Sequence, residues 1–361
     1  MSVIPIISQF NNKRVFITGH TGFKGSWLGY WMHSLGAVVK GLALAPNTEP
    51  NLFKGLQLEE RFESTIRDIN DLANLREAII SFQPDFVFHL AAQPLVRRSY
   101  RNTIDTFQTN VIGTANVLEA LRWLEKPCVC VCITTDKVYH NNEWIYPYRE
   151  NDQLGGYDPY SASKSAAEII IASYVSSFFN PNNVSKHKKA IASARAGNVI
   201  GGGDWSEDRL LPDIVKALSG NKDIYIRNPG AVRPWQHVME PLVGYMMLAL
   251  RLSEDATKYS GAWNFGPYNQ DNLSVIHLAN AAVEMWGSGN LTISNDLNAV
   301  HEAHLLRLDI SKAISELKWT PKMDATLAIK RTIDWYKRFY SGENVTTLMD
   351  EDLNFYQSLL N

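Results

Sequence analysis

The feature that limits the fold most strongly is a glycine-rich turn at residues 19–25, GHTGFKG. The segment before this turn, 13–18, has the composition of a short strand. The residues that follow predict a helix over 25–35 and a second strand over 37–44. A β-α-β unit of this length holds its two strands parallel, so we expect a parallel sheet.

The spacing of the glycines, GxxGxxG, directly after a strand indicates a site for a dinucleotide. Gly19 permits the tight turn, Gly22 lets backbone N–H groups approach a pyrophosphate, and Gly25 lets the helix pack closely on the strand. The second strand ends without a carboxylate for the adenosine ribose and without an arginine for a 2′-phosphate. The turn therefore predicts a dinucleotide, and the second strand leaves NAD and NADP both open.

Helical and strand-like segments continue to alternate along the chain. The further predicted elements are helices over 72–82, 110–124 and 160–178 and strands over 86–90, 128–134 and 190–194. We expect residues 1–195 to form one doubly wound α/β domain of the Rossmann type. Glycine and proline loosen the pattern beyond Asn198. Residues 196–361 are expected to form mainly a smaller α/β substrate domain, with some segments returning to the first domain.

Composition argues against two classes of partner. A formal net charge of −2 disfavours nucleic acid, because binding a polyanion requires clustered basic residues. No apolar run approaches the ~18–20 residues that span a bilayer. The first ten residues also differ from a secretory signal, which begins with basic residues and ends at a cleavage site. We expect a cytoplasmic protein with neither a membrane nor a nucleic acid as its partner.

Three cysteines, Cys128, Cys130 and Cys132, alternate with valines in one predicted strand. This alternation places the three thiols on one face of the strand. Their spacing differs from the paired CxxC arrangement of zinc sites, and a metal would need a fourth ligand. We interpret them as structural thiols and expect no metal site.

Two residues suited to proton transfer, Tyr160 and Lys164, occur in the segment YSASK. On a helix this spacing places both side chains on one face. A nearby ammonium favours the ionised form of a phenol, which suits Tyr160 to act as a base toward a sugar hydroxyl. The alternative interpretation is a surface helix on which Lys164 pairs with Glu168.

A second polar group, Thr135, Asp136 and Lys137, follows the strand over 128–134. Ligands of open parallel sheets bind at this C-terminal end of the strands. A hydroxyl, a carboxylate and an amine together are suited to hold a substrate hydroxyl, donate a proton and accept one. The alternative for Lys137 is a solvated lysine at a strand end.

These motifs together resemble the extended short-chain dehydrogenase/reductase family, over essentially the whole chain. The resemblance implies NAD as the cofactor. It implies contacts with that cofactor from Gly19, Thr21, Gly22, Phe23, Lys24, Gly25, Asp68, Ile69, Leu90, Ala91, Ala92, Asn110, Tyr160 and Lys164. Within the family, a Thr-Asp pair followed by an ionisable residue resembles the nucleotide-sugar 4,6-dehydratases.

One position narrows this resemblance. The dehydratases of deoxythymidine-diphosphate glucose have Glu after the Asp, whereas this chain has Lys137. Lys137 and the segments GFKGSW at 22–27, GDW at 203–205, RPWQHV at 233–238 and HEAH at 301–304 resemble the dehydratases that act on CDP-D-glucose. The implied products are CDP-4-keto-6-deoxy-D-glucose and water. The ketosugar would supply deoxysugars for surface polysaccharide such as lipopolysaccharide O-antigen.

The resemblance also implies a role for each catalytic residue. Tyr160 removes the proton of the C4 hydroxyl during transient oxidation at C4, while Thr135 holds that hydroxyl and Lys164 lowers the pKa of the phenol. Asp136 protonates the departing C6 hydroxyl in the elimination across C5 and C6, and hydride then returns to C6. Lys137 either accepts the C5 proton or stays charged and stabilises the enolate.

Family position further implies a set of residues that bind the nucleotide sugar, namely Asn198, Arg209, Arg233, His237 and His301. Arginine suits a diphosphate because its guanidinium forms bidentate, charge-assisted bonds with phosphate oxygens. The alternative for Arg209 is a salt bridge with Glu207 or Asp208.

Two other activities stay open. A nucleotide-sugar 4-epimerase would use Tyr160 and Lys164 without loss of water, and a non-catalytic nicotinamide sensor would keep only the glycine turn. Family analogy also implies that the helices over 110–124 and 160–178 pack against a second subunit. We therefore expect a homodimer or a homotetramer.

Overall fold

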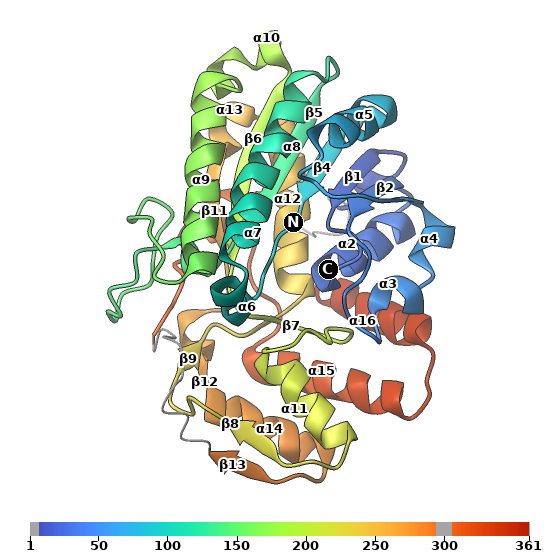
Figure 1. The fold of residues 1–361 in the computed structure, drawn as a ribbon, viewed down its shortest axis with the longest axis vertical. Helices are drawn as coiled ribbons and strands as arrows, with labels where there is room; N and C mark the ends of the chain where they lie inside the picture. The colour runs from blue at the N-terminus through green and yellow to red at the C-terminus, as the bar shows by residue number, and fades with distance from the viewer. Residues whose placement is uncertain (1–6, 294–304, 361) are drawn as a thin grey trace.

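The centre of the protein is a seven-stranded parallel sheet, seen in a computed structural model that describes residues 7–293 and 305–360 (Figure 1). The strands lie in the order β11-β6-β5-β4-β1-β2-β3, and every neighbouring pair is parallel. They are β1 (Arg14–Thr18), β2 (Val38–Ala43), β3 (Glu63–Ile66), β4 (Phe86–His89), β5 (Cys128–Ile133), β6 (Lys189–Ala196) and β11 (Gly261–Phe265). The order reverses between β1 and β4, which opens a crevice at their C-terminal ends. The expected doubly wound parallel sheet is confirmed.

Helices cover both faces of this sheet. One face carries α5 (Leu72–Phe82), α8 (Gly113–Arg122) and α9 (Pro159–Ser177), and the other carries α2 (Phe23–Ser34) and α12 (Met239–Glu254). The strands are therefore buried on both sides, which explains why they read as continuous apolar runs.

The three cysteines of β5 point into the layer beneath α8 and α9, whereas the valines between them point toward α12. The predicted sharing of one face is thus confirmed. The Sγ atoms of Cys130 and Cys132 lie 3.7 Å apart. Burial raises the pKa of the Cys128 thiol to about 12, so this thiol stays protonated and unreactive.

The helical run predicted over 110–124 begins earlier than expected. It starts with α6 (Val96–Arg101) and α7 (Thr103–Phe107) and continues through a π-helical turn, η2 (Gln108–Ile112), into α8. The buried Asn110 lies inside this turn. A π-helical turn at such a position is a frequent mark of a functional region.

The second region, at the bottom of Figure 1, lies beyond the C-terminal edge of the sheet. Its elements are β7 (Val199–Ile200), α11 (Leu210–Ser219), β8 (Ile224–Ile226), β9 (Val232–Arg233), β10 (Gln236–His237), β12 (Leu273–Ser274), α14 (Val275–Trp286), β13 (Leu291–Ile293) and α15 (Ala325–Tyr340). The short strands pair as β7 with β10, β9 with β12 and β8 with β13.

The chain passes between the two regions more than once. After α11 and β8 it forms α12, which packs on β5 and β6, and then β11, which pairs with β6. Near the C-terminus, α16 (Val345–Leu359) packs against α3 (Leu52–Gly55). The sheet that holds the glycine turn is thus completed by residues far beyond 195.

A buried carboxylate fastens the C-terminal segments to α12. Glu240 accepts hydrogen bonds from the backbone N–H groups of Lys322 and Met323 at 2.9 and 2.7 Å and from the Tyr356 hydroxyl at 2.7 Å.

The remaining short elements are η1 (Ser8–Phe10), α4 (Leu58–Arg61), η3 (Asp136–Val138), η4 (Pro181–Asn183), α10 (Val184–His187), α13 (Ala256–Tyr259), η5 (Asn269–Asp271) and η6 (Ala313–Leu317). No helix in the described part of the chain is long and apolar enough to cross a bilayer.

Candidate active site

The glycine turn closes against the end of β4. Gly19 has a φ of +78°, and a Cβ at this position would lie 2.6 Å from the backbone nitrogen of Ala91. A Cβ on Gly25 would overlap the carbonyl oxygen of Gly19. The segment 90–92 therefore borders the turn, where the Ala91 N–H also donates to the Thr18 hydroxyl at 3.3 Å.

The turn presents an open backbone face at the start of α2. A Cβ on Gly22 would meet nothing closer than the Gly19 carbonyl oxygen at 3.5 Å, and Gly22 caps α2 without a side-chain hydrogen bond. The first N–H groups of a helix need an acceptor, and with the helix dipole they favour an anion. The Thr21 hydroxyl donates to the Leu44 carbonyl at 2.7 Å and holds the turn on the end of β2. The residues present thus fit the pyrophosphate of a dinucleotide.

Asp68 and Ile69 follow β3, next to the end of β2. The Arg67 N–H donates to the Ala43 carbonyl at 2.8 Å, which keeps this segment beside the second strand. Asp68 is exposed and accepts from the Asn70 N–H at 2.9 Å, whereas Ile69 is 3% exposed. Asp68 supplies, at the end of the third strand, a carboxylate that the end of the second strand lacks.

Asn110 is fully buried and links the segment after β4 to α9. Its Oδ1 accepts from the Gln93 N–H at 2.9 Å, and its Nδ2 donates to the Ser163 hydroxyl at 2.8 Å. These bonds hold α9 in register with the end of β4. The structure gives Asn110 this positioning contact within the expected cofactor region.

Tyr160 and Lys164 lie one turn apart near the start of α9 and are both buried. Asp158 caps the helix by accepting from the Ser161 N–H at 2.9 Å. The Tyr160 hydroxyl shares a hydrogen bond with Thr135. The Lys164 Nζ donates to the Ile133 carbonyl at 3.2 Å, at the end of β5.

The Glu168 carboxylate, one turn beyond Lys164, forms an ion pair with Arg195 of β6 instead. Two hydrogen bonds of 3.0 and 2.9 Å join the pair, and each side chain is 3% exposed. Glu168 also accepts from the Thr134 and Ser193 hydroxyls at 2.5 and 2.8 Å. The surface Lys164–Glu168 pair of the alternative interpretation is therefore not what the structure shows.

Burial governs the pKa values of the tyrosine and lysine. It raises the pKa of Tyr160 to about 12, opposed by the Thr135 hydrogen bond and reinforced by the Asp136 charge. It lowers the pKa of Lys164 to about 8. We expected Lys164 to lower the pKa of the phenol. In this structure Lys164 donates to a backbone carbonyl, and Thr135 and Arg209 are the groups that lower the pKa of Tyr160.

Thr135, Asp136 and Lys137 meet Tyr160 at the end of β5. The Thr135 hydroxyl donates to the Asp136 Oδ1 at 2.9 Å, and the Lys137 Nζ lies 3.7 Å from the same oxygen. Asp136 is 1% exposed, and within the described residues its Oδ2 has no hydrogen-bond partner. A Cβ on Gly197 would lie 3.0 Å from this Oδ2. A glycine at 197 thus keeps one carboxylate oxygen open toward the cavity.

These residues line one cavity of about 1130 Å³. Thr135, Asp136, Lys137 and Tyr160 form part of its wall, together with Phe23 and Lys24 from the glycine turn. Asn198, Arg209 and Arg233 complete it from the second region. Lys164 is buried and does not border the cavity. The size exceeds the ~300–1,000 Å³ of ordinary ligand pockets and suits two large ligands side by side.

Lys24 brings a further positive charge to this cavity. Its Nζ lies 5.9 Å from the centroid of the Tyr245 ring. Burial, followed by the charges of Arg209 and Lys164, lowers its pKa to about 7, and Asp136 opposes that shift. Lys24, Arg209 and Arg233 all border the cavity, and cationic side chains there favour an anionic ligand such as a diphosphate.

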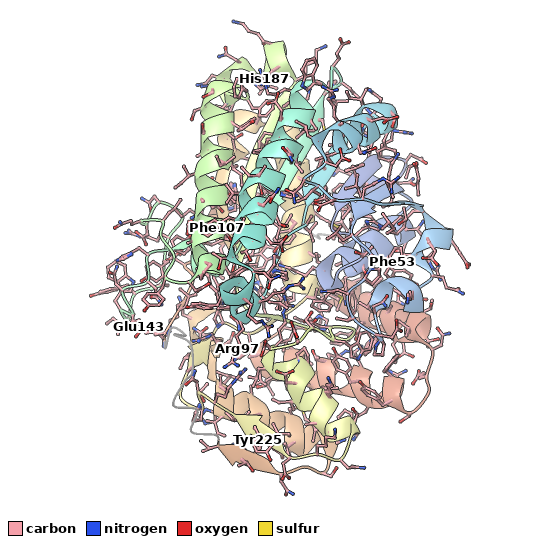
Figure 2. All side chains as sticks on the ribbon, in the orientation of Figure 1. Phe53, Arg97, Phe107, Glu143, His187 and Tyr225 are labelled. Atoms are coloured by element: carbon pink, nitrogen blue, oxygen red, sulfur yellow. The ribbon has the colours of Figure 1, made fainter. Side chains whose placement is uncertain are left out.

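Arg209 pairs with a different carboxylate from those expected. Its Nη1 lies 2.7 Å from the Asp204 Oδ2. Asp208 instead lies 3.9 Å from Arg97 and 3.8 Å from Arg227. Figure 2 shows Arg97 where the two regions meet. Arg209 remains part of the cavity wall despite its ion pair.

Of the two histidines in the predicted set, the structure describes only His237, and this residue does not border the cavity. His237 is fully buried with its ring against Trp27, at 6.1 Å between centroids, and burial lowers its pKa to about 3. His301 lies outside the described residues.

Sequence reasoning also missed residues of the cavity wall such as Asp213 and Tyr225, which come from short elements without a motif. Within the described residues, no group of three or more metal-ligating side chains is found.

Comparisons with known proteins agree with this geometry. Residues 16–332 match the family model of GDP-mannose 4,6 dehydratase. The chain is 47% identical over 349 residues to CDP-glucose 4,6-dehydratase of Salmonella typhimurium, which covers 97% of each chain. It is 28% identical to CDP-paratose 2-epimerase of Salmonella typhi, over 89% of this chain and 98% of that protein.

Solved structures show the same fold. A dTDP-glucose 4,6-dehydratase of Bacillus anthracis in complex with NAD superposes with a TM-score of 0.77. The match covers 93% of this chain and 99% of that one, at 20% sequence identity. A UDP-glucose 4-epimerase of Thermotoga maritima with UDP-glucose gives a TM-score of 0.76 over 90% and 99%, at 19% identity.

Proposed function

Since this chain belongs to the GDP-mannose 4,6-dehydratase family of NAD-dependent enzymes, we propose that it is a CDP-D-glucose 4,6-dehydratase. The observation that carries the proposal is the 47% identity, over nearly the whole of both chains, with the Salmonella enzyme of that activity. The products are CDP-4-keto-6-deoxy-D-glucose and water, and the ketosugar is a precursor of deoxysugars. We infer a cytoplasmic location, where nucleotide sugars and NAD are made.

The open N-terminus of α2 and the glycine turn hold the pyrophosphate of NAD, and Lys24 adds a positive charge near it. When bound, NAD supplies the oxidant that accepts hydride from C4 of the glucose and later returns it to C6. The protein moves the protons. Tyr160 takes the proton of the C4 hydroxyl. Thr135, whose hydroxyl interacts with the phenol, holds that C4 hydroxyl in place.

Elimination falls to the residues after β5. The open Oδ2 of Asp136 is available to hold the proton that the C6 hydroxyl needs in order to leave as water. Lys137 is near enough to share charge with Asp136, at 3.7 Å, and it either takes the C5 proton or stabilises the enolate oxygen. Arg209 and Arg233 bind the diphosphate of the substrate.

Mass spectrometry after incubation with CDP-D-glucose and NAD⁺ tests this proposal. A product lighter by one water, with a new ketone, is the expected result. A product of unchanged mass would indicate a 4-epimerase in its place, and absence of turnover with intact binding would indicate a sensor. The tyrosine variant Tyr160→Phe is the control, because it loses the redox step without losing the cavity.

We also infer that two subunits pack through α8 and α9. The protein is then a homodimer, or a homotetramer that contains this interface twice. Apolar side chains are exposed on these helices and at their C-terminal ends: Ile169 of α9 is 59% exposed, and Trp123 and Phe178, directly after α8 and α9, are 58% and 42% exposed. Exposed apolar side chains on an outer helical layer are typical of a surface that contacts another protein chain. Light scattering of wild type and of Ile169→Asp tests the inference, and a monomeric wild type would contradict it.

A further inference from the structure

One face of α11 lines the cavity and is apolar except at a single position. Leu210, Asp213, Ile214 and Ala217 follow the i, i+3, i+4, i+7 spacing of one helical face, and all four border the cavity. Opposite them, Ile224 and Ile226 of β8 border the same space. The walls are suited to a flat apolar ring, and Asp213 is the acidic exception on the helix face.

Asp213 lies farther from the reacting groups than Arg209 does. Arg209 caps α11, and its charge acts on both Tyr160 and Lys24. The Asp213 N–H bonds to the Arg209 carbonyl at 2.9 Å, so Asp213 lies one turn farther along the helix. One turn advances the helix by about 5.4 Å. Figure 2 shows Tyr225, on β8, toward the outer end of the second region.

A nucleotide sugar has to span this cavity in one direction. Its sugar must reach Tyr160 and Thr135, and its diphosphate must lie beside Arg209, if the proposed function holds. The base then extends past Arg209 along α11, between that helix and β8. The first acidic side chain that it meets on the helix face is Asp213.

The Asp213 carboxylate is available to a ligand. Its side chain is exposed, and within the described residues no hydrogen bond or salt bridge is found for the carboxylate, although the charges of Arg227 and Lys216 reach it. The neighbouring carboxylate, Asp208, is placed between Arg97 and Arg227. Partial desolvation in the cavity wall and the Asp208 charge, opposed by the charges of Arg227 and Lys216, raise the pKa of Asp213 to about 6, so at pH 7.5 it is ionised and acts only as an acceptor.

We propose that Asp213 selects cytosine, by accepting a hydrogen bond from the exocyclic amine of the base. Cytosine presents an N4 amine, which donates, whereas uracil and thymine present an O4 oxygen, which accepts. A carboxylate opposite O4 would leave two acceptors facing each other without a proton. Asp213 is thus a specificity-determining residue for the cytidine nucleotide, and this assignment rests on the proposed function.

Calorimetric binding of CDP and UDP, at pH 7.5 with NAD present, tests the assignment. We expect wild type to prefer CDP, and Asp213→Leu to bind CDP about fivefold to 150-fold more weakly, the range of one good base contact. UDP binding by this variant should be no weaker than in wild type, because the acceptor that faced O4 is gone. Asp213→Asn should raise the affinity for UDP relative to CDP, because its amide can donate to O4.

Asp223→Asn is the matched control, since Asp223 is another carboxylate that borders the same cavity, directly before β8. This variant should keep the wild-type ratio of CDP to UDP affinity. An unchanged ratio in Asp213→Leu would overturn the assignment, as would a loss of the ratio in Asp223→Asn alone. Tight CDP binding by wild type without turnover of CDP-D-glucose would instead overturn the proposed function and leave the role of Asp213 standing.

Discussion

Replacing Arg195 with methionine removes the cation that holds the Glu168 carboxylate next to the catalytic helix. The pair is almost completely buried, with each side chain 3% exposed and two hydrogen bonds of 3.0 and 2.9 Å between them. Breaking such a pair from one side costs about 3–5 kcal/mol, because the remaining charge stays buried without its partner. We expect Arg195→Met to lose about that much of its unfolding free energy.

The same change should disturb catalysis. Glu168 lies one turn beyond Lys164, and its charge already acts on that ammonium. Without Arg195, we expect the carboxylate to attract Lys164, which would move away from the Ile133 carbonyl and from Tyr160. We expect kcat to fall on the order of a hundredfold, the lower end of what a positioned proton-transfer group contributes.

The double variant Arg195→Met/Glu168→Gln separates the two effects. The glutamine offers its amide oxygen to one of the two hydroxyls of Thr134 and Ser193 and its amide N–H to the other, and it carries no charge to capture Lys164. Urea unfolding and steady-state turnover of CDP-D-glucose should therefore both improve over the single variant. A double variant as unstable and as slow as Arg195→Met would refute this reasoning, since the loss would then come from packing alone.

Three further changes test the site and its support. Lys137→Gln should abolish or slow the entry of solvent deuterium at C5, and unchanged exchange would remove Lys137 from both of its proposed roles. Lys24 is charged only below its pKa of about 7, so the affinity for NAD should weaken as pH rises from 6 to 8.5, and Lys24→Met should flatten that titration. Glu240 has a folded pKa raised by burial from 4.5 to about 7, so its contribution to stability is present below pH 4.5 and is lost as pH rises through 7, by about 3 kcal/mol. Glu240→Gln should remove this dependence in urea unfolding between pH 4.5 and 8, and an equally steep pH curve would argue against it.

The parts of the site that the sequence predicted well depend on local spacing. The GxxGxxG turn and the YSASK segment each set the geometry of a few consecutive residues, and one helical turn or one strand end follows from that spacing. The structure brings the end of β5 and the start of α9 together because both border the same crevice of a parallel sheet.

The parts that it missed depend on contacts between distant segments. Glu168 forms its ion pair with Arg195, which lies 27 residues away in the sequence. Lys164 donates to a backbone carbonyl, and a sequence pattern does not reveal contacts with backbone atoms. His237 belongs to a polar-looking segment, yet β10 pairs with β7 and packs its ring under Trp27. The register of such contacts is set by tertiary packing, which outweighs local preference.

The return of the chain to complete the sheet determines how this enzyme can be divided. A fragment that ended after β6 would expose the edge of that strand, which β11 covers, and the apolar face on which α12 lies. Open edges and bare apolar faces promote association with other chains. The nucleotide-binding half is therefore not a transferable module, and recombination in nature or in the laboratory should exchange loops of this protein rather than halves.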